Sequence, residues 1–287
     1  MRERLSAPMS VAIDLVPSRA PGSLYLRIGG AIVALYVTIA VIGPIIAPYS
    51  ADEQDLLAAL DPPSLAHLFG TDPLGRDVLS RVIIGTRFTL TATFVSVGAA
   101  LIAGIALGVA AGYLEGRIAA AIAGFIDLLL TIPSLVLAIA IASVIGAGLF
   151  GLILAISITF VPPMARLVRG CVLELKSADY VEAARAIGTS DLGIMRRHIL
   201  PNALTVIIVE ASLAAGQAVL VAAALGFLGL GVQPPAPEWG TMLGAGREYM
   251  QRAPYLVLCP GVAISLLILG FNLLGDGLRD RFDPRSG

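Results

Sequence analysis

The sequence predicts an all-α membrane protein that crosses the bilayer about six times. Of its 287 residues, 57% are hydrophobic and only 14% are charged, whereas a soluble chain has about 25% charged residues. Its mean hydropathy is +0.89. At about 20 apolar residues per crossing, the chain has room for roughly six crossings and their loops. The net charge of −1 gives no basic surplus that would indicate nucleic acid binding.

Six apolar segments fit this estimate. They lie at 28–47, 88–113, 118–145, 149–168, 203–227 and 255–274. Together they define a transmembrane domain at 28–274, with expected cytoplasmic tails at 1–27 and 275–287. The first tail contains no long apolar core, so it does not resemble a cleavable signal peptide. Pro133 should bend the third segment.

Basic residues are unequally distributed between the two sets of loops. If both termini lie inside, 14 Arg and Lys residues fall in inner segments and five in outer segments. Because Lys and Arg favour the cytoplasmic side of a membrane, we expect both termini in the cytoplasm. The longest inner loop is then 169–201, and an acidic loop before the second segment lies outside.

Several motifs are excluded by their context. The only lysine, Lys176, lies in a near match to a phosphate-binding loop at 170–177, but Leu175 stands where the second glycine is required. The run GAGLFG at 146–151 lies between two apolar segments with no strand before it, so we interpret it as a tight outer turn. Cys171 and Cys259 are expected on opposite faces of the membrane, which excludes a disulfide, and no metal-ligand spacing occurs.

Glycines in the second segment predict close helix packing. Gly104, Gly108 and Gly112 recur at intervals of four residues and therefore share one helix face. Such a face lets a second helix approach closely in lipid. The alternative is that these glycines are merely tolerated in an apolar helix.

Three polar residues lie within apolar segments, where ionisable groups are costly and indicate function. Asp127 and Glu210 lie in the inner halves of their segments, which favours pairing with an inner Arg over substrate contact. Gln217 lies deeper and suits either a water-filled path or a hydrogen bond between helices.

The inner loop predicts two short helices separated by a glycine turn. Asp179 and Glu182 are spaced as a capping box for the first helix, and Gly188 should end that helix. Thr189 or Ser190 can cap the second helix, which should end before Pro201. One face of the first helix carries Tyr180, Ala183, Ala184 and Ile187, with Glu182 and Arg185 beside it. From spacing alone, this hairpin suits a partner protein or the lipid interface equally well.

The order of residues in this loop resembles a known pattern. Residues 180–204 read YVEAARAIGTSDLGIMRRHILPNAL and are similar to the EAA loop of permease subunits in bacterial ATP-binding-cassette (ABC) importers. The positions in register are Glu182, Ala183, Ala184, Gly188, Leu200 and Pro201. His198 replaces the isoleucine of the general pattern, as in the dipeptide, oligopeptide and nickel subgroup.

Two further stretches resemble the C-type permease of that subgroup. They are FGTDPLGRDVLSRVIIGTRFTL at 69–90 and FLGLGVQPPAPEWGTMLGAG at 227–246. The resemblance runs from residue 28 to 284 and implies the type I ABC importer (MetI-like) fold with a cytoplasmic coupling helix. In the outer stretch, we expect the segment with Trp239 and Gly240 to form a short helix that helps to dock a binding protein.

The resemblance implies a non-catalytic subunit in the bacterial inner membrane. Its partners would be a homologous B-type permease, two ABC ATPase subunits and an extracytoplasmic solute-binding protein, and ATP and Mg would bind only to the ATPases. The expected coupling residues are Tyr180, Glu182, Ala183, Ala184, Arg185, Ile187, Gly188, Leu200 and Pro201. Di- or oligopeptides are the first expectation for the cargo, with nickel, glutathione or another small solute as alternatives. A secondary transporter would need its own buried coupling groups.

Overall fold

The computed structural model describes residues 22–282, which are helical apart from connecting loops and one isolated bridge between Thr71 and Asp77. The five long helices are α1 (Gly22–Ile46), α2 (Val78–Tyr113), α5 (Leu149–Lys176), α8 (Leu200–Phe227) and α10 (Tyr255–Phe282). The shorter helices are α3 (Arg117–Leu130), α4 (Ser134–Ile145), α6 (Asp179–Ala186), α7 (Asp191–Ile194) and α9 (Trp239–Gly246). Single turns lie at η1 (Leu56–Ala58), η2 (Met195–Ile199) and η3 (Arg247–Tyr249).

The number of apolar segments agrees with the prediction, but the third segment is not one bent helix. Five helices are long and apolar enough to cross a membrane, and α3 with α4 forms a sixth segment that is bent by 94°. The break falls at 131–133 because proline disfavours helical geometry at the preceding residue and has no N–H of its own. Pro133 is extended, with ψ at 131°.

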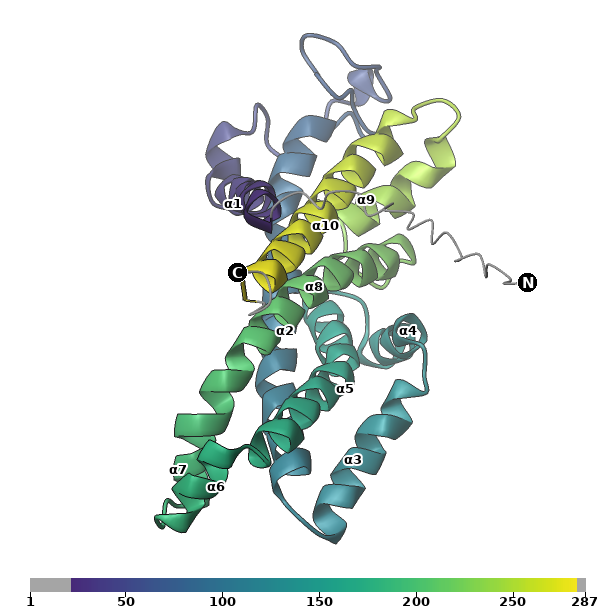
Figure 1. The fold of residues 1–287 in the computed structure, drawn as a ribbon. Helices are drawn as coiled ribbons and strands as arrows, with labels where there is room; N and C mark the ends of the chain where they lie inside the picture. The colour runs from purple at the N-terminus through teal and green to yellow at the C-terminus, as the bar shows by residue number, and fades with distance from the viewer. Residues whose placement is uncertain (1–21, 283–287) are drawn as a thin grey trace, which may run out of the picture.

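The glycine face of α2 packs against α5, side by side in Figure 1. A Cβ added to Gly104 would lie 2.7 Å from the Met164 Cβ, and one added to Gly108 would lie 2.5 Å from the Ala165 carbonyl oxygen. At Gly112 the corresponding distance to the Val172 Cβ is 2.9 Å. All three positions therefore lie at a contact too close for any larger residue.

A second close contact, not predicted from the sequence, joins α1 to α10. A Cβ added to Gly29 would lie 2.3 Å from the Leu274 backbone nitrogen, and one added to Gly277 would lie 2.3 Å from that of Leu26. Farther along, the Tyr36 hydroxyl donates to the Ala263 carbonyl at 3.0 Å. These pairs show that the two helices run antiparallel.

The long helices extend beyond the predicted apolar segments. Helix α2 begins at Val78 rather than at Phe88, because Asp77 caps it by accepting from the Ser80 N–H at 2.7 Å. Helix α5 continues past Val168 to Lys176. The main core lies where α2, α5, α8 and α10 meet, and many of its members are alanines, as is typical of helices packed in lipid.

The second half of the inner loop differs from the prediction. Rather than a separate short helix, α7, η2 and α8 form one continuous helical stretch from Asp191 to Phe227. The η2 turn is π-helical, and the Leu200 N–H donates to the Met195 carbonyl. A wider π turn reorganises the hydrogen bonds around Pro201, which has no N–H and would clash with the carbonyl four residues earlier.

Candidate functional site

Helix α6 lies at the end of the molecule formed by the last turns of α2 and α5, next to α7 (Figure 1). The predicted capping box is wrong. Ala178 is the N-cap residue with no side-chain cap, and its carbonyl accepts from the Val181 and Glu182 N–H groups. Asp179 is already helical, so its side chain is not placed to cap, although both acidic residues of this first turn favour the helix dipole.

The opposite end of α6 is closed by Gly188, as the sequence predicted. Its φ is +85°. The Gly188 N–H donates to the Arg185 carbonyl at 3.0 Å, and the Thr189 N–H donates to the Ala184 carbonyl at 3.0 Å. This pair of bonds is the Schellman motif. Ser190 then caps α7 by accepting from the Gly193 N–H at 3.3 Å.

Helix α6 has a buried side and an exposed side. Val181 is 0% exposed and Ala184 is buried with it, in a cluster that also contains Val172 of α5 and Ile199 of the π turn. The predicted small-residue face is therefore divided, because Ala184 points into this cluster while the other three members are exposed. Ile187 is 84% exposed. The residues available to a partner are Asp179, Tyr180, Glu182, Ala183, Arg185, Ala186 and Ile187.

Leu200 and Pro201 are the first two residues of α8, which begins close to α6. Leu200 is half-buried and Pro201 is exposed. The Tyr180 ring lies 6.2 Å from the His198 ring, centroid to centroid. Asn202 donates to the His198 carbonyl at 2.6 Å. The first and last parts of the predicted coupling loop therefore meet in space.

A polar network beside α6 was not predicted from the sequence. Lys176 donates to the Glu115 carboxylate at 2.7 Å and to the Tyr113 carbonyl at 3.2 Å, and the Tyr113 hydroxyl donates to Asp191. Lys176 lowers the pKa of Glu115 through this hydrogen bond and its charge, and Arg185 of α6 contributes in the same direction. The one available signal was that the chain has a single lysine.

The intramembrane polar residues do not pair as expected. Within residues 22–282, neither Asp127 nor Glu210 forms an ion pair with an arginine. Asp127 and Gln217 are exposed on this chain and Glu210 is half-buried. Glu210 lines a cavity together with Arg279 of α10. An exposed carboxylate on an apolar helix is unstable in lipid, so the surface around Asp127 requires a polar or protein environment.

The outer segment forms the expected short helix, α9, but Trp239 and Gly240 do not face outward. Trp239 is 0% exposed, and its indole N–H donates to the Val82 carbonyl at 2.9 Å. A Cβ on Gly240 would lie 2.7 Å from the Ala223 carbonyl oxygen. The expectation that these two residues contact a docked protein is wrong, because both fasten α9 to α2 and α8.

Glu238 caps α9 from a fully buried position. Its carboxylate accepts from the Gly240 N–H at 2.9 Å and from the Thr241 N–H at 3.0 Å. Burial raises the pKa of Glu238 to about 7, although these two bonds lower it in part. A sequence pattern could show the capping spacing but not the burial.

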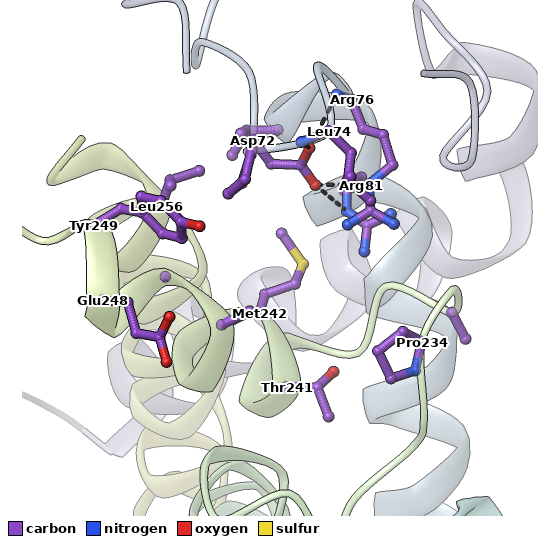
Figure 2. A pocket seen from close by; sticks show the side chains of 15 residues that line it. Asp72, Leu74, Arg76, Arg81, Pro234, Thr241, Met242, Glu248, Tyr249 and Leu256 are labelled. Atoms are coloured by element: carbon purple, nitrogen blue, oxygen red, sulfur yellow. Dashed lines mark hydrogen bonds and ion pairs between the residues drawn. The ribbon is translucent and has the colours of Figure 1, made fainter. Parts of the chain in front are cut away.

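An outer cavity of about 330 Å³ separates the start of α2 from α9 and η3 (Figure 2). Asp72 accepts from the Arg76 side chain at 2.7 Å and lies 3.7 Å from the Arg81 side chain. Arg81 also donates to the Ala51 carbonyl at 2.7 Å. The charged side chains on this side of the cavity therefore pair with one another and with the backbone, and these contacts stabilise the loop between α1 and α2. Within residues 22–282, no cluster of His, Cys, Asp or Glu could hold a metal ion.

Fold and site together define a class of protein. It is a polytopic helical protein in which one loop between two long helices carries a short helix with an exposed side, an arrangement that suits a membrane-embedded permease subunit. The chain belongs to the family of binding-protein-dependent transport system inner membrane components, whose model matches residues 104–287. The model for the N-terminal transmembrane domain of oligopeptide transport permease C matches residues 27–63.

Curated relatives agree with this assignment over most of the chain. The dipeptide transport system permease protein DppC of Alkalihalophilus pseudofirmus is 45% identical over 258 residues, which cover 90% of this chain and 85% of that protein. The di/tripeptide permease DppC of Pseudomonas aeruginosa is also 45% identical, with 88% and 85% covered. The glutathione permease GsiD of Pectobacterium atrosepticum is 44% identical, with 89% and 85% covered.

A solved structure supports the fold. The MetNI methionine ABC transporter, in an inward-facing conformation, matches with a TM-score of 0.57 at 24% identity. The match covers 69% of this chain and 94% of that chain. The predicted MetI-like fold is therefore confirmed, and the chain is the transmembrane permease subunit of a binding-protein-dependent ABC importer.

Proposed function

We propose that this permease imports di- or oligopeptides, and that α6 is the coupling helix held by an ABC ATPase. The observation that carries the coupling role is the division of α6 into two sides. Val181 anchors the helix to the rest of the chain, while Ala183 and Ile187 are exposed. An isoleucine that is 84% exposed at an inner loop suits an apolar cleft on a partner protein.

Closure of the ATPases would displace α6 and tilt the helices above it between inward-facing and outward-facing states. Glu182 can either cap α6 or pair with a basic residue of the ATPase. Its side chain is exposed and makes no capping bond, which favours the ion pair. An ATPase can shift the permease from one state to the other only if it binds the two states with different affinities. The exposed side of α6 offers a surface for the contacts that make this difference.

The rest of the machinery belongs to partner subunits. These are a B-type permease, two ATPase subunits that bind ATP and Mg, and an extracytoplasmic solute-binding protein. This chain carries no catalytic step, and its termini and α6 lie in the cytoplasm. The end of α5 contacts the α2–α3 turn through Lys176 and Glu115. Their proximity supports the topology predicted from the basic residues, in which both segments lie on the cytoplasmic side.

On the outer side, we place the docking of the binding protein on the loop between α1 and α2 instead of on Trp239. Leu57 and Leu65 of this loop are each 98% exposed, and the loop also carries Asp52, Glu53 and Asp55. Carboxylates disfavour insertion of the leucines into an anionic lipid surface. A protein with apolar and basic contact residues fits this surface better.

The identity of the relatives supports a peptide cargo. Two of them are named for dipeptide or di/tripeptide transport, and one is named for the tripeptide glutathione. Glutathione is therefore the second candidate cargo. A peptide bond with free amino and carboxyl ends is the chemistry that all of these cargoes share.

Reconstitution tests the proposal. The complete complex in proteoliposomes should take up a labelled dipeptide only when ATP is in the lumen, which corresponds to the cytoplasm, and the binding protein is in the external buffer. Unlabelled glutathione should compete if it is the true cargo. Uptake by this chain alone, driven by an ion gradient, would show a secondary transporter and refute the proposal.

A further inference from the structure

Lys176, the only lysine of the chain, is the last residue of α5. Its ammonium group donates to the Glu115 carboxylate at 2.7 Å and to the Tyr113 carbonyl at 3.2 Å, and lies 5.4 Å from the centroid of the Tyr113 ring. Glu115 lies in the turn between α2 and α3. Lys176 therefore joins the inner end of α5 to the inner end of α2.

Tyr113 continues this connection toward the coupling loop. It is the last residue of α2, and its hydroxyl donates to the carboxylate of Asp191, the first residue of α7. Its ring is buried in the same cluster as Val172 of α5 and Val181 of α6. One residue thus contacts the elements before and after α6.

We propose that Tyr113 and Lys176 are positioning residues that clamp the α6–α7 segment to the inner ends of α2 and α5, so that displacement of α6 moves both helices together. The clamp consists of the side chains of Tyr113, Glu115, Lys176 and Asp191. Its role rests on the proposed coupling function of α6.

The clamp adds directional contacts, which apolar packing does not provide. Apolar contacts are non-directional, so the cluster under Val181 holds α6 against the helices but resists sliding only weakly. Hydrogen bonds have preferred distances and angles. The bond of Tyr113 fixes the start of α7 against the end of α2, and the bonds of Lys176 fix the end of α5 against the same place, so α6, which lies between Lys176 and Asp191 in the chain, is held at both ends. Because α2 and α5 also touch closely at Gly112 and Val172, a displacement at the clamp passes to two helices at once.

The geometry also explains why a lysine suits this position. Its ammonium group is compact and has three donors that point in different directions. Two of them reach a carbonyl and a carboxylate that both lie at the end of α2. A guanidinium is larger and directs its donors within one plane, so it suits this arrangement less well.

The primary test compares single-group changes in the complete reconstituted complex. Tyr113→Phe keeps the ring in its cluster and removes only the hydroxyl, with its bond to Asp191 and its interaction with Arg185 of α6. We expect the number of ATP molecules hydrolysed per molecule imported to rise about two- to thirty-fold, the range of coupling changes from such positions, while the complex assembles normally. Tyr36→Phe is the matched control, because it removes a buried hydroxyl bond to the Ala263 carbonyl between α1 and α10.

Charge reversal provides a second arm that tests the Lys176–Glu115 pair itself. Lys176→Glu alone should raise the ATP-to-cargo ratio, and the double change of Lys176→Glu with Glu115→Lys should restore it in part. The inference is overturned if Tyr113→Phe and Lys176→Glu both transport with the unchanged ratio. If the unaltered complex imports no peptide with ATP, the proposed function fails instead.

Chemical labelling gives a readout that is independent of cargo. Since Lys176 is the only lysine, its acylated peptide is unambiguous in mass spectrometry of this subunit. A clamp that moves as a unit keeps the amine equally protected in the nucleotide-free and ATP-bound complexes, and Glu115→Gln should label several-fold faster in both. Faster labelling of the unaltered protein in one nucleotide state would show that the clamp opens and would overturn the inference.

Discussion

Gly188 occupies a backbone conformation that a side chain with a Cβ tolerates poorly. Its φ is +85°, and no atom lies within 4 Å of an added Cβ, so the cost of substitution is conformational and not steric. A non-glycine residue there costs about 1–2 kcal/mol. We expect Gly188→Val to reorient α6 and reduce ATP-driven uptake strongly, while Gly188→Asn, which adopts this conformation more readily, retains most of it. Equal uptake by both variants would contradict the role of this turn.

Glu238 makes the stability of the outer segment depend on pH. Its folded-state pKa is about 7, above the ordinary value of 4.5, so folding favours the protonated form. The stability is fully present below pH 4.5 and falls by about 3 kcal/mol as the pH rises through 7. In detergent, the apparent Tm of the complex should decrease between pH 5 and 8.

Glu238→Gln is the matched variant for this prediction. Its amide oxygen can still accept a bond from Gly240 or Thr241, but it carries no charge at any pH. We expect the Tm of this variant to decrease less between pH 5 and 8 than that of the unaltered complex. Identical slopes would show that Glu238 does not ionise in this range.

At this scale, the sequence is informative where a residue type has one structural use. Gly188 was assigned correctly, and Ser190 is one of the two caps that the sequence offered, because a left-handed turn and a helix cap each require particular chemistry. Asp179 was assigned wrongly because a polar residue near a helix start is chemically able to cap wherever the helix begins. The helix begins one residue earlier than expected, so that Ala178, which has no capping side chain, occupies the N-cap position. The burial of Glu238 depends on helices that are distant in sequence.

At the scale of elements, the glycine face of α2 makes a quantitative prediction. Gly108→Val places side-chain atoms where Ala165 and Val168 of α5 already lie, and such overpacking costs about 1–3 kcal/mol. Gly98→Val is the control in the same helix, because nothing lies within 4 Å of its added Cβ. The Tm of the purified complex should fall for Gly108→Val only. A similar decrease for both variants would attribute the effect to helix propensity and not to packing.

Element boundaries were predicted less well than the presence of the elements. Hydropathy located the apolar part of α2 but missed its first turns, which contain Ser80 and Arg81 and are stabilised by the outer loop instead of by lipid. The break between α3 and α4 follows from Pro133, but a proline in a membrane helix produces either a gentle bend or a full break. Neighbouring helices decide between these outcomes.

At the scale of the whole molecule, sequence order does not determine which distant segments meet. Lys176 and Glu115 are 61 positions apart, and Gly29 contacts α10 near the other end of the chain. The six apolar segments, their order and the inner loop could be predicted from the sequence because each depends on local composition. The clamp and the α1–α10 contact could not, because each depends on a pairing of helices.

The topology connects these scales and can be tested with two cysteines. In a variant that lacks Cys171 and Cys259, Leu65→Cys should react with a membrane-impermeant thiol reagent in intact cells, after permeabilising the outer membrane where one is present, because Leu65 is 98% exposed on the outer loop. Ile187→Cys, at a site that is 84% exposed, should react only after the inner membrane is opened. Added binding protein should protect the first cysteine, and bound ATPase should protect the second. Labelling of Ile187→Cys in cells with an intact inner membrane would reverse the orientation and place α6 beyond the reach of any cytoplasmic ATPase.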